Sequence, residues 1–235
     1  MRLRPGSFTP LSSGGLTGEE RRSILRDAAG IGIAVGAYGI SFGAVSIAAG
    51  LTVAQACALS ALAFTGASQF SFVGVVGAGG APLAGMATAL LLGSRNTLYG
   101  LRMSALLRVT GGRRLLAAHV TIDETTAMAV VRPTPAGSRL AFWATAVSVF
   151  SLWNLATLFG ALGAGALGDP RALGLDAAVP AAFLGLLWAR LRTGGEARFV
   201  ALAGAAVAIG TSLLLPAGVP ILLAALVAVR LRARR

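Results

Sequence analysis

The sequence predicts an all-α, polytopic membrane protein: a transmembrane helical bundle with one or two broken or re-entrant helices. Residues 28–94 form a run of 67 positions without one charged side chain. A single helix of that length would extend about 100 Å, whereas the hydrocarbon core of a bilayer is about 30 Å thick. Hydrophobic residues make up 56% of the chain and charged residues 12%, and 32 of its 235 residues are glycine. Glycine allows membrane helices to approach closely, so the composition favours a tightly packed bundle.

The net charge of +12 comes from arginines that cluster between the apolar runs and at both ends of the chain. This distribution is typical of the cytoplasmic loops of membrane proteins, and it argues against a nucleic-acid-binding face. The single cysteine, Cys57, excludes an internal disulfide, and we expect it to pack within its apolar run.

We divide the chain into a cytoplasmic N-terminal leader (residues 1–27), a single transmembrane domain (28–231) and a cytoplasmic basic tail (232–235). Within the leader, Thr17-Gly-Glu-Glu20 matches the pattern of a capping box. This pattern predicts a short helix over residues 18–27, ahead of the first membrane segment.

Seven apolar segments follow the leader, at residues 28–49, 52–79, 81–107, 140–166, 173–190, 197–215 and 217–231. If every arginine-rich loop is cytoplasmic, the N-terminus and the 108–114 loop lie on the same side of the membrane. The three segments between them then make two full crossings, and the remaining segment is broken or re-entrant. The alternative is that one arginine-rich loop lies outside.

Two later regions also depart from simple spans. Residues 115–131 carry three ionisable groups between flanking arginines, which indicates a re-entrant or interfacial helix. The run from Phe199 to Val229 is split by Pro216-Ala-Gly-Val-Pro220 and is basic at both ends. Proline ends helices, so this run predicts a helical hairpin with its tip outside. Both termini are therefore expected in the cytoplasm.

The segment 52–79 contains the polar stretch Thr65-Gly-Ala-Ser-Gln-Phe70 near its middle. Hydroxyl groups can satisfy backbone groups that a helix break leaves free, and an amide both donates and accepts hydrogen bonds. We therefore predict a helix broken at Gly66, with Thr65, Ser68 and Gln69 in a substrate site. A helix–helix contact explains the same residues equally well.

The charge-free run ends at Ser94-Arg95-Asn96-Thr97-Leu98-Tyr99-Gly100. An arginine at the centre of a membrane helix costs roughly 2.5–3.5 kcal/mol on insertion scales, so its side chain should face a partner or water. A guanidinium can bind a carboxylate through two parallel hydrogen bonds. We predict that Arg95, with Asn96 and Tyr99, shares one substrate site with Ser68. The side chain of Arg102 is expected to extend to the membrane surface instead.

His119, Asp123 and Glu124 are candidates for proton coupling. His119 and Asp123 are four residues apart and would share one face of a helix, which suits a proton relay. A solvated cytoplasmic helix is the alternative. The group is too small to predict a metal site, and no cofactor is expected. An intramembrane protease is disfavoured, because the chain has no Gly-x-Ser-x-Gly motif and His119 lies in its least membrane-like stretch.

A series of motifs in the chain resembles the AzlC family, the large subunits of bacterial branched-chain amino acid exporters. In chain order they are Gly66-Ala-Ser-Gln-Phe70, Arg95-Asn96-x-x-Tyr99-Gly100-Leu101, Asp123-Glu124 and Gly174-Leu175-Asp176. The resemblance extends from about residue 30 to residue 230. It implies export of leucine, isoleucine, valine or analogues, together with a small hydrophobic membrane subunit of the AzlD type.

The expected function is export across the bacterial inner membrane by alternating access. The proton gradient is the expected energy source, because no Gly-x-x-x-x-Gly-Lys-Ser/Thr nucleotide-binding motif is present. The small subunit would pack against glycines such as Gly160, Gly163 and Gly165, although packing within the chain or with a second copy explains them too. The alternatives are a transporter or channel for another small solute and a membrane scaffold without transport activity. No enzymatic activity is expected.

Overall fold

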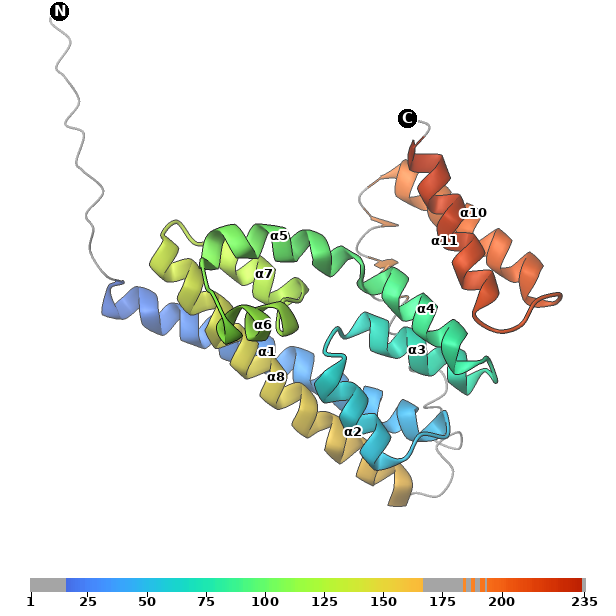
Figure 1. The fold of residues 1–235 in the computed structure, drawn as a ribbon, viewed down its shortest axis with the longest axis horizontal. Helices are drawn as coiled ribbons and strands as arrows, with labels where there is room; N and C mark the ends of the chain where they lie inside the picture. Colours follow the sequence, from blue (N-terminus) through green and yellow to red (C-terminus); the bar gives the residue numbers. More distant parts are fainter. Residues whose placement is uncertain (1–15, 167–183, 185–186, 189–190, 193, 234–235) are drawn as a thin grey trace, which may run out of the picture.

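The computed structural model describes residues 16–166, 184, 187–188, 191–192 and 194–233, and every regular element in these residues is a helix. Most of the predicted segment 173–190, with the motif Gly174-Leu175-Asp176, lies outside the described residues. The helices are α1 (Gly18–Ala48), α2 (Val53–Leu62), α3 (Ala67–Gly77), α4 (Pro82–Gly93), α5 (Arg95–Leu107), α6 (Gly112–His119), α7 (Asp123–Val130), α8 (Pro135–Ala166), α10 (Gly195–Ser212) and α11 (Val219–Ala233) (Figure 1). The predicted all-α class is confirmed for the described residues.

Helices α1 and α8 form a long parallel pair that supports the other elements (Figure 1). Both are long and apolar enough to cross a membrane. Their contacts advance together along the two chains: Gly32 meets Ser148, Gly36 meets Leu152 and Gly43 meets Thr157. Small residues let the two backbones approach, because a Cβ on Gly43 would collide with the backbone of Thr157.

Gly160 lies inside this pair and is not available to a partner helix. A Cβ at Gly160 would collide with the backbone of Ile40 on α1. The prediction that Gly160 receives a helix of another subunit is therefore wrong, and packing within the chain explains this glycine. Gly163 has open space around it. The surroundings of Gly165 lie outside the described residues.

The predicted capping box at the start of α1 is confirmed. The Thr17 hydroxyl accepts a hydrogen bond from the Glu20 amide (3.2 Å), and the Glu20 carboxylate accepts one from the Thr17 amide (2.9 Å). The helix that begins there does not end near residue 27, as was expected, but continues to Ala48. No proline lies between Gly18 and Ala48, so the end of the leader and the first apolar run join in one helix. That the membrane begins near residue 28, after the leader, stays a prediction.

The predicted break at Gly66 is confirmed, and it folds the segment back on itself. Gly66 has φ +62° and ψ −96°, a conformation that favours glycine, and α2 and α3 on either side have only 10 and 11 residues. α2 runs back along α8, so that Ser60 bonds Thr157 and Phe64 then packs against Phe150. α3 returns in the opposite direction: Phe70 packs against Trp153, and Gly77 lies beside Ala49. We call α2 and α3 the first hairpin.

α4 and α5 follow as one bent element. α4 runs antiparallel to α3, with Gly85 beside Phe72 and Gly93 beside Ser68. The chain bends at Ser94, whose hydroxyl donates to the Leu91 carbonyl (2.7 Å). α5 then carries the chain toward the end of the bundle where α1 begins (Figure 1).

Residues 112–130 form a second hairpin from the opposite end of the bundle. α6 ends at His119, which packs against Phe150. α7 runs back toward the start of α1, where Met128 and Ile24 lie in one buried cluster. Arg132 then pairs with Asp27 of α1 (2.9 Å). The expectation of a single helix over 115–131 is wrong, because the chain leaves the helix at residues 120–122. We call α6 and α7 the second hairpin.

α10 and α11 form the helical hairpin predicted from the two prolines. Its turn includes Gly218 at φ +97°, and Gly218 packs against Ala84 at the start of α4. The tip of this hairpin therefore lies at the end of the bundle where α1 finishes and α4 begins. Whether that end lies outside the membrane stays a prediction.

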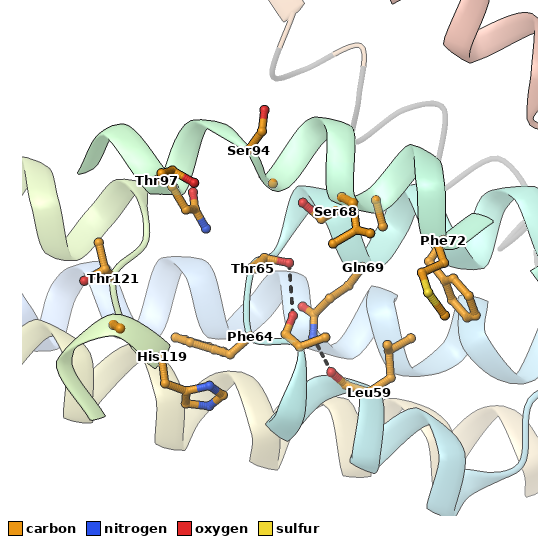
Figure 2. Close-up of a pocket in the computed structure, with 17 residues that line it drawn as sticks. Leu59, Phe64, Thr65, Ser68, Gln69, Phe72, Ser94, Thr97, His119 and Thr121 are labelled. Carbon is orange, nitrogen blue, oxygen red and sulfur yellow. Dashed lines mark hydrogen bonds between the residues drawn. The ribbon is translucent and has the colours of Figure 1, made fainter. Parts of the chain in front are cut away.

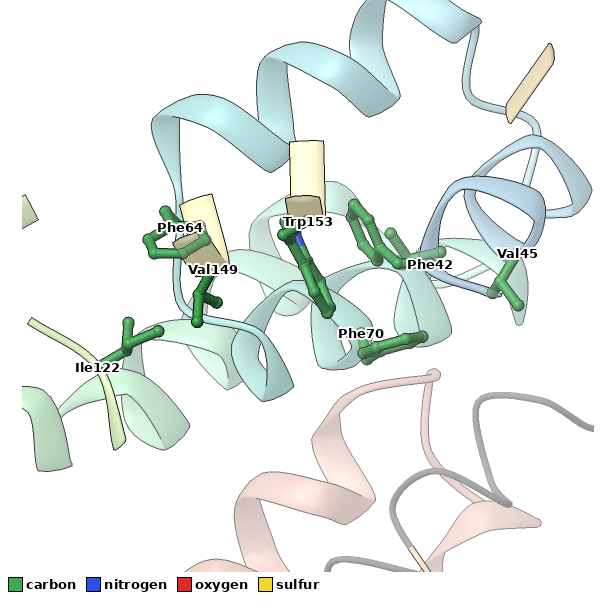
Figure 3. Close-up of a cluster of buried hydrophobic side chains, with 8 residues drawn as sticks. Phe42, Val45, Phe64, Phe70, Ile122, Val149 and Trp153 are labelled. Carbon is green, nitrogen blue, oxygen red and sulfur yellow. The ribbon is translucent and has the colours of Figure 1, made fainter. Parts of the chain in front are cut away.

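The largest buried cluster joins the helix pair to both hairpins. Figure 3 shows Phe42, Trp153 and Val149 of the pair together with Phe64 and Phe70 of the first hairpin and Ile122 of the second. Phe42 stacks on Trp153 with ring centroids 5.7 Å apart, and its ring meets Phe70 edge-on at 5.3 Å. These contacts hold the tips of both hairpins at the same position along the α1–α8 pair.

Candidate functional site

The tips of the two hairpins meet halfway along the α1–α8 pair. Phe64 of the first tip lies beside His119 of the second, and both rings contact Phe150. The His119 Nε2 atom lies 2.9 Å from the Ala61 carbonyl oxygen, so a hydrogen bond also joins the hairpins. Two helices thus end, and two begin, at one level of the bundle. Helix breaks at such a level are how many transporters build a binding site.

Gln69 closes the break in the first hairpin. Its Oε1 accepts from the Gly66 amide (3.1 Å), and its Nε2 donates to the Ser60 carbonyl (3.2 Å). Nε2 also donates to the Leu59 carbonyl (2.8 Å; Figure 2). Thr65 donates to the Ala63 carbonyl (3.0 Å). Buried backbone groups that a break leaves free need such partners. The side chain of Gln69 is therefore occupied by the fold, although the residue was predicted as part of a substrate site.

Thr125 closes the break in the second hairpin. Its hydroxyl accepts from the Ile122 amide (2.9 Å) and donates to the Val120 carbonyl (2.9 Å). Because α6 ends at His119 and α7 begins at Asp123, these two residues do not share a helical face. The predicted pairing of His119 with Asp123 is wrong. His119 bonds the first hairpin instead, and Asp123 faces α5.

Arg95 pairs with Asp123 across the interior. The guanidinium Nη2 lies 2.8 Å from the Asp123 Oδ2, and both side chains are part-exposed, at 37% and 41%. The bend at Ser94 places Arg95 in the first turn of α5, next to the start of α7. The partner predicted for Arg95 is thus a carboxylate of the same chain.

The ion pair lines one of two cavities at the tips, which we call the charged cavity. It has a volume of about 430 Å³. Its polar lining includes Glu124 and Thr65 besides the ion pair, and its apolar wall includes Val35, Tyr38, Phe70, Ile122, Val149 and Trp153. Three buried atoms here have no hydrogen-bond partner: Arg95 Nε, Asp123 Oδ1 and the indole nitrogen of Trp153. The cavity is therefore lined by residues with two unpartnered N–H groups, by carboxylates and by an apolar surface.

The second cavity, which we call the neutral cavity, lies between the first hairpin, α4 and the tip of the second hairpin (Figure 2). It has a volume of about 720 Å³ and includes Ser68, Gln69, Asn96 and His119 in its lining. No arginine or carboxylate lines it. Ser68 Oγ and Asn96 Oδ1 are buried without a partner.

The residues predicted to form one substrate site are therefore divided. Ser68 and Arg95 line different cavities, and Thr65 lines both. Tyr99 lines neither of them. Sequence reasoning missed Tyr38 and Trp153 of the charged cavity. A tryptophan in the middle of an apolar helix was an available signal, because a buried indole N–H needs an acceptor.

The described residues contain no group of three or more His, Cys, Asp or Glu side chains that could hold a metal ion. Comparison with known families gave a match to a family model described as AzlC protein, over residues 30–167. The matched range covers more than half of the chain and contains both hairpins and both cavities. Searches of curated proteins and of solved structures found no match.

Proposed function

Because the chain belongs to the AzlC family, we propose that it is the large subunit of a two-component exporter of branched-chain amino acids in the bacterial inner membrane. The family is one of transporter components, not of enzymes. Leucine, isoleucine, valine or close analogues are the proposed substrates, and the proton gradient is the proposed energy source.

The observation that carries this proposal is the charged cavity. An amino acid brings a carboxylate, an ammonium group and a side chain, and a buried site must satisfy both charges. The unpartnered N–H groups of Arg95 and Trp153 suit the carboxylate, and the amides of Ala67 and Ser68, which open α3 beside Gly66, could add to them. Glu124 suits the ammonium group. The apolar wall between Val149 and Ile122 suits a branched side chain.

The arrangement of helices supports a membrane topology. α1 and α8 run parallel, so if both cross the bilayer, the chain between them must return once. The bent element α4–α5 is the proposed return, and the two hairpins enter from opposite sides without crossing. The arginines near residues 21–26, 108–114 and 132–139 support a cytoplasmic start of α1.

Cysteine labelling tests this topology in a Cys57→Ala background. Single cysteines at Arg113, Gly137 and Gly194 should resist an impermeant reagent in intact spheroplasts, whereas a cysteine at Gly218 should react. Labelling at Arg113 would refute the second hairpin as a re-entrant element from the cytoplasmic side.

The proposed partner is a small hydrophobic membrane subunit of the AzlD type. The family membership carries this part of the proposal, and lipid alone accounts for the exposed apolar surface as well. Co-purification in mild detergent tests the partner. Full export by this chain expressed alone would refute an obligate two-component exporter.

Export itself is tested in cells fed with leucine-containing dipeptides, by following intracellular and external leucine. Expression of the chain with its partner should lower intracellular leucine. Trp153→Phe keeps the ring but removes the free N–H, and we expect about a tenfold loss of export, because a hydrogen bond to a charged group contributes roughly 1.5–3 kcal/mol. Trp143→Phe is the matched control, since Trp143 is on the same helix and lines neither cavity.

Equal leucine levels with and without the exporter would refute the proposal. Export of another small solute, with leucine unaffected, would favour the alternative of a different substrate on the same scaffold. Transport of no solute would favour a scaffold role.

A further inference from the structure

The charged cavity is lined by two acidic side chains and one basic side chain. Its ionisable side chains, apart from the tyrosine, are Arg95, Asp123 and Glu124. Arg95 is engaged by Asp123 at 2.8 Å. Glu124 makes no hydrogen bond or ion pair with the side chain of any other described residue, and its own backbone amide and the charges of Asp123 and Arg95 act on it. One carboxyl group of the cavity is therefore left without a counter-charge.

The surroundings of Glu124 do not supply one. Besides Arg95 of α5, the other elements that line the cavity contribute no cation: α1 contributes Tyr38, the first hairpin contributes Thr65 and Phe70, and α8 contributes Val149 and Trp153. The one histidine of the chain, His119, lines the neutral cavity and bonds the Ala61 carbonyl. A carboxylate beside this apolar wall has no counter-ion of its own, so binding of a proton or a cation is favoured there, although the amides at the start of α7 lower the cost of the charge.

We propose that Glu124 holds a proton when the cavity is empty and releases it when the ammonium group of an amino acid takes its place. This inference rests on the proposed function and supplies its coupling step. The O–H bond of the Glu124 carboxyl breaks, the proton passes to water in the cavity, and the carboxylate pairs with the ammonium group. No electron transfer or further reactant is involved.

Because the Glu124 carboxyl group can bind either a proton or an amino acid but not both, the two are exchanged across the membrane. When the cavity faces the cytoplasm, the amino acid displaces the proton, and when it faces outside, a proton displaces the amino acid. Each exported molecule is then exchanged for one entering proton. Asp123 is less suited to this role, because Arg95 already balances its charge in the empty cavity. The predicted proton relay of His119 with Asp123 depended on a shared helical face, which the two residues do not have.

The direct test is proton release by the purified full-length chain, with its partner where the two co-purify. Leucine is added in weakly buffered detergent solution with a pH indicator, and binding is measured in parallel. The wild type should release up to about one proton per leucine, and its leucine affinity should rise up to about tenfold per pH unit while Glu124 is protonated in the empty state. Glu124→Gln should bind leucine more weakly, without proton release and without pH dependence.

Two controls separate this coupling from general damage. Glu19→Gln makes the same chemical change at an exposed residue of the leader and should leave proton release intact. The hydroxy acid 2-hydroxy-4-methylpentanoate keeps the carboxylate and the branched chain but lacks the ammonium group. Added to the wild type, it should release no proton.

Leucine binding without proton release by the wild type would overturn the inference and leave export possible. Proton release that persists in Glu124→Gln would also overturn it. If the wild type neither binds nor exports leucine, the proposed function fails, and the inference fails with it.

Discussion

The first and second hairpins end at the same level of the bundle, but different chemistry closes their breaks. The first tip uses Gly66 at φ +62° and the amide of Gln69. The second tip uses Ile122 in an extended conformation (φ −129°) and the hydroxyl of Thr125. In both, the third residue of the new helix accepts a hydrogen bond from the amide of the residue just before that helix. The same side chain donates to a carbonyl earlier in the chain, of Leu59 in α2 or of Val120 just after α6.

The difference between the tips shows which polar residues remain for a ligand. The first tip carries only neutral polar groups, and the side chain of Gln69 is hydrogen-bonded to the backbone. The second tip carries Asp123 and Glu124 at the start of α7, where the helix dipole favours negative charge. The first hairpin is thus a neutral wall, and the second supplies the carboxylates. Four predictions test this division, beginning with the largest expected effect.

Removal of the guanidinium that faces the acidic tip should have the largest effect. In Arg95→Gln, Asp123 and Glu124 lose the cation between them, and we expect export to fall at least about 30-fold, equivalent to about 2 kcal/mol. Arg95→Lys should keep part of the activity, because one N–H···O contact at 2.8 Å forms the pair. Arg102→Gln on the same helix is the control. Wild-type export by Arg95→Gln, measured in dipeptide-fed cells, would remove the ion pair from the mechanism.

Removal of the side chain that closes each break should destabilise the first tip more than the second. Gln69→Ala leaves the Gly66 amide and the Ser60 carbonyl without partners, at roughly 1–3 kcal/mol each. Thr125→Ala removes a helix cap, at about 1 kcal/mol. The apparent melting temperature in detergent should fall further for Gln69→Ala. Equal shifts for the two variants would show that the tips are equivalent.

A substitution at Gly66 in the first tip should lower stability more than a substitution at Ile122 in the second tip. Gly66→Ala forces a Cβ into a backbone conformation that L residues rarely adopt, and we expect a loss of roughly 1–3 kcal/mol. Ile122→Val, in extended backbone, should cost about 1 kcal/mol or less, as expected for loss of one buried methylene. Thermal unfolding compares the two. An unchanged melting temperature for Gly66→Ala would mean that the tip can adopt another conformation.

The smallest effect is expected for the bond between the hairpins. His119→Ala removes one hydrogen bond to the Ala61 carbonyl, at about 0.5–1.5 kcal/mol, and should leave the pH dependence of export unchanged. Loss of that pH dependence, with stability intact, would return His119 to the proton path and weaken the assignment to Glu124.

Local residue chemistry determined much of the fold. The capping box at Thr17, the break at Gly66 and the turn at Pro216 follow from short patterns in which backbone hydrogen-bond needs and φ preferences act between near neighbours. The need of Arg95 for a partner also followed from its place at the end of a long charge-free run, since an unpaired charge is costly in an apolar medium.

Only the tertiary structure decided which groups meet. The break at residues 120–122 depends on Thr125 and on packing against the first hairpin, and it separates His119 from Asp123. The charged cavity brings Asp123 to Arg95 and places the carboxyl group of Glu124 and the indole of Trp153 beside them. These four residues are up to 58 positions apart in the chain. Such distant pairings depend on how whole helices reverse and pack, and no local pattern in the chain records them.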